Sequence, residues 1–263
     1  MDLARQRLIA ETWTGSEMKG IKAVIFDLHG TLLLSDDVDD AWDQWARAFH
    51  AELVKRGATM PLKEFKAALG SLYNGSEHIA HQPGLTLFEH RVKGFCERLG
   101  MEVPQHELRP LVETIIDVWH RDMYLDPDAV PLLKALRRRF KVGLITNWDH
   151  GPRMHRLVDQ LGIRRLLDDV VVSDDVGVAK PDPRIFRVAL GRLDVPASAA
   201  VYVGDMDLDA RGALDAGLHP VLVRRGGRGD WGSYSEAVDC SYDLEKVTII
   251  ERLADLLPLL VDE

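Results

Sequence analysis

KAVIFDLHGTLL, residues 22–33, joins an apolar run to a polar turn. Successive apolar residues with no polar residue between them are typical of a short strand buried on both faces, as in the middle of a parallel sheet. We therefore predict a strand over residues 22–28. Asp27, His29 and Thr31 fall at its carboxyl end, where open α/β sheets bind their ligands.

The second half of the chain alternates short apolar runs with helical patterns. Further strands are predicted over 142–146, 170–173, 199–204 and 220–224. Helices are predicted before and between them, over 129–140, 151–161, 184–193 and 208–216. Because strands that alternate with helices form parallel sheets covered on both faces, this half predicts a doubly wound, Rossmann-like α/β fold.

Residues 35–126 carry no strand pattern and show helical periodicity instead. Apolar side chains recur there at helical spacing, and we interpret Trp42 and Trp45 on this stripe as a packing face rather than a ligand platform. Further helices are predicted over 61–69, 85–99 and 105–121. We expect an inserted α-helical cap domain formed by residues 35–126 and a catalytic core formed by residues 1–34 and 127–263.

The size and charge of the chain limit the classes of function. Its 263 residues are enough for a large α/β domain with a smaller inserted one. A net charge of −9 disfavours a nucleic-acid-binding or membrane-binding surface, and we interpret the basic segment 224–230 as a solvated surface turn. A small anionic substrate is compatible with this charge, because a bound metal ion and one lysine can reverse the local field. The two cysteines, Cys96 and Cys240, and the lack of an apolar stretch of about 20 residues predict a cytoplasmic protein with no membrane segment.

Four polar motifs are expected together at one edge of the sheet. Asp27 to Thr31 follow the first strand, Thr146-Asn147 the second, Lys180-Pro181 come after the third, and Gly204-Asp205 with Asp209 follow the fourth. In a parallel sheet the carboxyl ends of all strands meet at one edge, so these side chains should surround one crevice. Three carboxylates, a lysine and two threonine hydroxyls there form a site suited to a metal ion and an oxyanion.

The order of these motifs resembles the four motifs of the haloacid dehalogenase (HAD) superfamily. In this chain they are Asp-x-x-Gly-Thr, Thr-Asn, Lys-Pro-Asp-Pro and Gly-Asp-x-x-x-Asp-x-x-Gly-Ala. The likeness covers residues 22–34 and 126–259, and the helical insertion stands where this family carries its cap. For the phosphatases of the family, the resemblance implies attack by an aspartate on a small phosphate ester beside a Mg²⁺ ion.

On this resemblance, Asp27 is the nucleophile that forms an aspartyl-phosphate. Asp205, one oxygen of Asp27 and the backbone carbonyl of His29 would hold Mg²⁺. Asp209 would complete the metal site by orienting Lys180 or a metal-bound water. Lys180 would neutralise charge on Asp27 and on the transferred phosphoryl group.

The resemblance also implies substrate contacts. Thr146 and the backbone N–H of Asn147 would hydrogen-bond the transferring group, and Thr31 would add a contact from the first motif. Trp148 borders the crevice and would either contact the substrate or pack against the cap. Phosphoryl transfer requires chiefly positioning and compensation of oxygen charge, and these residue types supply both.

His29 stands where HAD phosphatases carry a second Asp, which protonates the leaving group and then activates water. Imidazole, with an ordinary pKa of about 6.5, can take over both steps, and the nearby carboxylates should raise that pKa somewhat. Alternatively, the change marks a dehalogenase, since HAD dehalogenases also lack Asp at this position. In a third interpretation His29 merely lines the pocket.

Asp205 and Asp209 favour the phosphatase over the dehalogenase. HAD dehalogenases work without metal and lack the first acid of the fourth motif, and carboxylates crowded in one crevice repel each other unless a cation offsets them. The leading prediction is a Mg²⁺-dependent phosphohydrolase of a small phosphate ester. The alternatives are a metal-independent 2-haloacid dehalogenase of the same fold, and a ligand-binding protein that has lost turnover.

Overall fold

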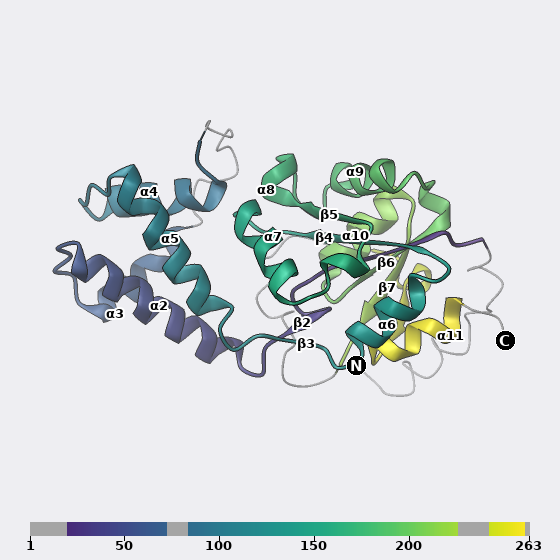
Figure 1. Ribbon diagram of the computed structural model, residues 1–263. Helices are drawn as coiled ribbons and strands as arrows, with labels where there is room; N and C mark the ends of the chain where they lie inside the picture. The colour runs from purple at the N-terminus through teal and green to yellow at the C-terminus, as the bar shows by residue number, and fades with distance from the viewer. Residues whose placement is uncertain (1–19, 73–83, 226–241, 261–263) are drawn as a thin grey trace.

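The computed structural model describes residues 20–72, 84–225 and 242–260. It shows an α/β part and a group of helices, joined near the short strands β2 (Leu33–Leu34) and β3 (Tyr124–Leu125) (Figure 1). Cys240 and residues 226–230 of the basic segment lie outside the described residues.

Six parallel strands form the sheet, in the order β5-β4-β1-β6-β7-β8. Their bounds are β1 (Ala23–Phe26), β4 (Lys141–Thr146), β5 (Asp169–Val172), β6 (Ala200–Gly204), β7 (His219–Val223) and β8 (Thr248–Ile250). Ala23 of β1 stands opposite Lys141 on one side and Ala200 on the other, so β1 is a central strand. The predicted doubly wound α/β fold is confirmed. β8 has no counterpart among the predicted strands, because its exposed Ile249 and short length leave no buried apolar run.

Helices cover both faces of this sheet. They are α6 (Ala129–Leu136), α7 (Gly151–Gln160), α8 (Ser173–Val176), α9 (Pro183–Leu193), α10 (Asp207–Ala216) and α11 (Leu256–Leu260). Val24 and Phe26 of β1 pack in a cluster with side chains of α6, α7 and α11. Ala23 and Ile25 pack in a second cluster with side chains of α9 and α10. Because successive side chains of a strand point to opposite faces, a strand covered on both faces needs an unbroken apolar run.

The group of helices has a hydrophobic cluster of its own. Its members are α2 (Val38–Lys55), α3 (Leu62–Ala68), α4 (Leu87–Arg98) and α5 (Gln105–Trp119). Trp45 and Phe49 of α2 are buried in this cluster with their ring centroids 5.6 Å apart. Trp45 therefore belongs to a packing face, in agreement with the interpretation of the apolar stripe. Asp37 precedes α2, and its side chain caps the helix by accepting a hydrogen bond from the N–H of Asp40.

The strands β2 and β3 pair in antiparallel fashion where the chain leaves the sheet and returns to it. Leu33 stands opposite Leu125, and Leu34 stands opposite Tyr124. This pair lies beside the expected limits of the cap at residues 35 and 126. The pair is not among the predicted strands, because two residues on each side are too few to give a recognisable pattern.

Short 3₁₀ helices complete the connections. They are η1 (Leu69–Leu72), η3 (Arg164–Leu166), η4 (Ala197–Ala199), η6 (Leu244–Lys246) and η7 (Leu253–Asp255). Within the described ranges, no helix combines the length and the apolar character that crossing a membrane requires.

Candidate active site

Asp27 directly follows β1 at the carboxyl edge of the sheet. The strand β1 lies between β4 and β6, where the chain crosses from one half of the sheet to the other. Open α/β sheets bind their ligands at such a switch point. The N–H of Asp27 donates to the carbonyl of Val203 in β6 (2.8 Å), so the neighbouring strand fixes the position of this residue.

Lys180 links two of the predicted acids. Its Nζ atom lies 2.7 Å from Oδ1 of Asp27 and 2.8 Å from Oδ1 of Asp209, and all three side chains are buried. Burial acts against the ammonium ion, but the charges of Asp209 and Asp27 outweigh it and raise the pKa of Lys180. Burial also raises the pKa of Asp27 to about 6, although Lys180 acts to lower it. The lysine is therefore a buried positive charge in contact with the predicted nucleophile.

Both oxygen atoms of Asp209 are engaged within the protein. Besides Lys180, its Oδ1 accepts a hydrogen bond from the hydroxyl of Tyr202 (3.2 Å). Its Oδ2 accepts from the backbone N–H groups of Asp205 (3.2 Å) and Met206 (3.0 Å). Asp209 thus holds the turn that carries Asp205 and fixes Lys180 at the same time.

Asp205 has an oxygen atom without a partner. Its Oδ1 accepts from the hydroxyl of Thr31 (2.9 Å), whereas its buried Oδ2 has no hydrogen-bond partner among the described residues. Burial first, and then the charges of Asp209 and Asp27, raise the pKa of Asp205 well above its usual value. Oxygen atoms of Asp27, Asp205 and Asp209 lie within 4.8 Å of one another. A buried carboxylate oxygen without a partner, beside two other carboxylates, fits a hard cation such as Mg²⁺.

The turn after Asp27 is held by two further features. Gly30 has a φ of 79°, and a Cβ atom at this residue would lie 2.2 Å from Oδ2 of Asp205. Arg225 donates to the carbonyls of Gly30 (2.6 Å) and Thr31 (2.8 Å) and to Oδ2 of Asp126 (2.8 Å). The interpretation of the basic segment as a solvated turn is therefore wrong for Arg225. Its guanidinium group binds the acceptors of the first motif instead of facing water.

The end of β4 places a hydroxyl and an amide at the same edge. Thr146 is 1% exposed, and its Oγ1 has no hydrogen-bond partner in the part of the chain that the structure describes. The side-chain amide of Asn147 donates to the carbonyl of Lys180 (2.9 Å) and accepts from its N–H (2.8 Å). The side chain of Asn147 therefore positions Lys180. This role is distinct from the substrate contact that we expect of the backbone N–H of Asn147.

His29 and Trp148 form a stack where the core meets the helices. Their ring centroids are 4.9 Å apart at an interplanar angle of 16°, and Trp148 also packs against the hydrophobic cluster of the helices. Nε2 of His29 lies 3.1 Å from Nε2 of His120, which follows α5. Burial, and after it the charge of Lys180, lower the pKa of His29 to about 3. The expected rise of this pKa is wrong, because the loss of water around the ring outweighs the influence of the carboxylates.

Three residues of the site were not predicted to belong to it. Tyr202 lies inside β6, and a polar side chain in a buried strand could have drawn attention to it. Arg225 comes two residues after the end of β7, so its place at the carboxyl edge could have been inferred from the strand pattern. No pattern in the sequence points to His120, because a single histidine at the end of a helix does not reveal its partner.

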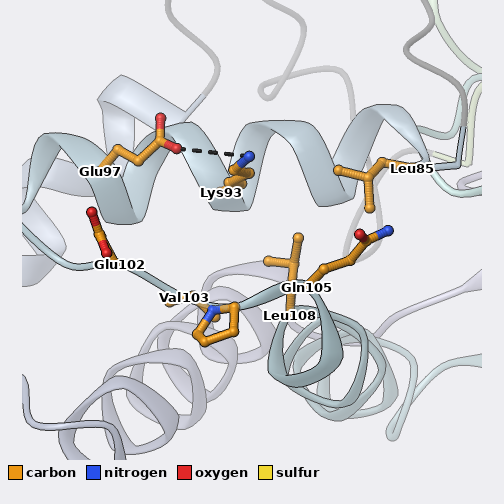
Figure 2. A pocket seen from close by; sticks show the side chains of 8 residues that line it. Leu85, Lys93, Glu97, Glu102, Val103, Gln105 and Leu108 are labelled. Carbon is orange, nitrogen blue, oxygen red and sulfur yellow. Dashed lines mark ion pairs between the residues drawn. The ribbon is translucent and has the colours of Figure 1, made fainter.

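A cavity of about 440 Å³ lies among the helices, between α4 and the start of α5 (Figure 2). Its lining consists of Leu85, Lys93, Glu97, Glu102, Val103, Pro104, Gln105 and Leu108. None of the predicted site residues lines it. Gln105 begins the 15-residue helix α5 and His120 follows its end, so the two lie roughly 20 Å apart along the helix axis. The cavity is therefore separate from the acid cluster around Asp27.

Comparisons with known proteins show the family and the fold of the chain. The sequence model of a hydrolase family, described as haloacid dehalogenase-like hydrolase, matches residues 21–217. The chain is 34% identical over 212 residues to a glyceraldehyde 3-phosphate phosphatase of Methanopyrus kandleri, covering 78% of this chain and 85% of that protein. Among solved structures, it resembles a 2-haloacid dehalogenase of Pseudomonas syringae pv. tomato (TM-score 0.62, 25% identity, 91% of this chain and 98% of that one). A HAD phosphatase of Thermococcus onnurineus gives the same TM-score and coverage at 23% identity, which supports the fold alone.

Proposed function

The chain belongs to the haloacid dehalogenase-like hydrolase family, and we propose that it is a Mg²⁺-dependent phosphohydrolase of a small phosphate ester. The observation that carries the proposal is the unpartnered Oδ2 of Asp205 in the buried acid cluster beside Asp27. A dehalogenase that works without metal has no use for a buried carboxylate at this position, whereas a cation site requires one. The similarity to a glyceraldehyde 3-phosphate phosphatase supports a phosphate ester as the substrate class.

We assign Asp27 as the nucleophile. Lys180 contacts its Oδ1 at 2.7 Å, which orients the carboxylate and offsets its charge. In the first step a bond forms between an Asp27 oxygen and phosphorus, and the bond from phosphorus to the ester oxygen breaks. In the second step water attacks the aspartyl-phosphate, which releases inorganic phosphate and regenerates the carboxylate. The leaving oxygen takes up one proton from solvent, and the attacking water gives one up, so the two steps balance.

The cation would be held by Asp205, Asp27 and the backbone carbonyl of His29. When bound, the ion supplies positive charge next to the nucleophile and the phosphoryl oxygens. Thr31 orients Asp205 through its hydroxyl, so we assign it to the metal site rather than to the substrate. Asp209 would support the site without binding the cation directly, since its two oxygens already accept hydrogen bonds from Lys180 and from the turn at Asp205.

The transferring phosphoryl group would be bound at the end of β4. The Oγ1 of Thr146 is a buried donor without a partner among the described residues, and the backbone N–H of Asn147 follows it. The side chain of Asn147 fixes the backbone of Lys180, so the lysine is positioned from the same loop. Donors that are held in place before the reaction stabilise the transition state without reorganisation.

His29 takes the position of the family's second Asp, and we assign it to the water step. Its lowered pKa keeps the ring neutral near pH 7, so it has a lone pair that can accept the proton of the attacking water. A neutral ring is a poor proton donor for the leaving group. We therefore expect aryl phosphates, which need little protonation of the leaving group, to react faster than alkyl phosphates.

Residues 35–126 would act as a cap over this site. The N–H of Leu87, in the first turn of α4, donates to Oδ1 of Asp174 (2.9 Å), and the N–H of Phe88 donates to the carbonyl of Asp149 (2.7 Å). Asp149 and Asp174 lie in the segments that follow β4 and β5, at the carboxyl edge of the sheet. The start of α4 therefore rests on the rim of the crevice, as a closed cap would.

A panel of phosphate esters and 2-haloacids, assayed with Mg²⁺ and with EDTA, tests the proposal. We expect phosphate release from at least one ester with Mg²⁺, loss of that activity in EDTA, and no chloride release from 2-chloropropionate. Chloride release that persists in EDTA would establish the dehalogenase instead. Inactivity on the whole panel with retained ligand binding would establish the non-catalytic protein.

A further inference from the structure

His120 has no part in the mechanism above, yet it contacts the residue at which this chain departs from its family. It is the residue after α5, it is buried, and its Nε2 lies 3.1 Å from Nε2 of His29. His29 belongs to the core and His120 to the cap. The contact therefore joins the proposed acid/base residue to the domain that covers it.

The hydrogen bonds around His120 determine which nitrogen carries each proton. Nδ1 of His120 lies 3.2 Å from the carbonyl of Ile116, and a carbonyl can only accept, so Nδ1 of His120 is the donor. The ring of His120 is buried, and the groups at its two nitrogens are a carbonyl and a second imidazole rather than a carboxylate, so a neutral ring with Nε2 as the acceptor fits these contacts. The Nε2 of His29 must then be the donor in the contact between the two rings. In neutral His29 the lone pair is left on Nδ1, which is the nitrogen that can accept a proton.

The ring of His29 is oriented from two sides. Trp148 stacks on its face at 4.9 Å, and His120 binds its edge through Nε2. Trp148 follows β4, but it also packs against the hydrophobic cluster of the helices and lies 4.9 Å from the ring of His120, centroid to centroid. Both contacts to the ring of His29 therefore involve residues of the helical part.

Charged contacts near the end of α5 hold His120 in this place. Arg153 of α7 pairs with Asp117 in the last turn of α5 at 2.8 Å, and Arg156 of the same helix pairs with Glu113. These pairs join the cap to the core within seven residues of His120. Together with the contacts of α4, they describe a cap that is closed on the core.

We propose that His120 is a positioning residue, which selects the Nε2–H tautomer of His29 and fixes its ring when the cap closes. The proposal rests on the proposed function, in which His29 accepts the proton of the attacking water. Its consequence is that the step carried out by His29 requires a closed cap. A partner that accepts the other ring proton also makes the lone pair more basic, as carboxylates and carbonyls do for ligating histidines.

Two substitutions separate positioning from packing. His120→Phe keeps a flat ring but removes the acceptor, and His120→Gln keeps an acceptor at the end of a flexible side chain. His106→Gln is the matched control, since it removes an exposed histidine from the other end of the same helix. We would measure the tautomer of His29 by ¹⁵N NMR of histidine-labelled full-length protein near pH 7, with the signals of His29 assigned by their loss in His29→Gln. Steady-state kinetics on an aryl phosphate with Mg²⁺ would be measured in parallel.

We expect the parent and His106→Gln to show His29 protonated at Nε2 and unprotonated at Nδ1. His120→Phe should show a mixture of tautomers and a kcat lower by roughly 10- to 100-fold, with KM little changed. His120→Gln should restore the single tautomer and most of the rate. The proposal is overturned by a parent with the proton on Nδ1, or by a His120→Phe protein in which the tautomer is unchanged, whatever its rate. If no ester is hydrolysed by the parent, the proposed function fails, while the NMR measurement still decides whether His120 sets the tautomer.

Discussion

Folding stability should depend on pH through His29, and His29→Gln measures by how much. Burial lowers the pKa of His29 to about 3 in the folded protein, whereas an imidazole in an unfolded chain titrates at about 6.5. Below that pH the unfolded chain takes up a proton that folded His29 does not, so stability is lost as the pH falls. Between pH 7 and pH 5 this linkage amounts to about 2 kcal/mol for one imidazole. The size of this loss depends on the ordinary pKa of the imidazole in the unfolded chain, because folded His29 stays neutral between pH 7 and pH 5.

Urea unfolding at pH 7, 6 and 5 in EDTA gives this quantity as a difference between two proteins. The parent should lose about 2 kcal/mol more than His29→Gln over the window. The raised pKa values of Asp27 and Asp205 act with the opposite sign, but both proteins contain them, so their contribution cancels in the comparison. His106→Gln, at a site where the side chain is 81% exposed, should follow the parent. Equal losses in the parent and His29→Gln would refute a buried, neutral His29.

Three further substitutions test the metal site and the turn around it. Gly30→Ala should abolish Mg²⁺ binding in calorimetry, because its Cβ would lie 2.2 Å from Oδ2 of Asp205; Gly70→Ala, with no atom within 4 Å, should bind normally. Thr31→Val should weaken Mg²⁺ binding by roughly 10- to 100-fold, since Asp205 loses the hydroxyl that orients it, and unchanged affinity would exclude that role. Arg225→Leu should lower the unfolding free energy by about 1–3 kcal/mol, because two carbonyls and a carboxylate lose their donor; an unchanged denaturation midpoint would count against this clamp.

The fold could be predicted largely because the central strand β1 must be apolar on both of its faces. The run at residues 23–26 is apolar on both faces, which a central parallel strand demands and an exposed strand does not. Helical periodicity likewise indicated the helices of residues 35–126. The pair β2–β3 could not be predicted, since backbone pairing of two residues on each side leaves no mark on side-chain pattern.

The grouping of acids and lysine around Asp27 could also be inferred, because the carboxyl ends of parallel strands share one edge. Other features of the site depend on how distant parts of the chain pack. Arg225 contacts the first motif because of the position of β7, and His120 contacts His29 because the end of α5 packs beside the sheet. The sequence also led us to expect a raised pKa for His29, whereas its pKa is lowered, again because distant parts of the chain pack around it. Neighbouring charges can be inferred from strand ends, but the loss of water around a ring depends on how the helices pack over it.

The most direct test of the central claim is to trap the phosphorylated enzyme. The full-length protein would be mixed with an aryl phosphate and Mg²⁺, quenched in acid within one turnover, digested, and analysed by mass spectrometry. We predict one phosphoryl group on the peptide that contains Asp27, its absence in EDTA, and its absence in Asp27→Asn, which should also release no phosphate. Phosphate release by the parent without any phosphoryl-Asp27, or release within tenfold of the parent rate by Asp27→Asn, would contradict Asp27 as the nucleophile.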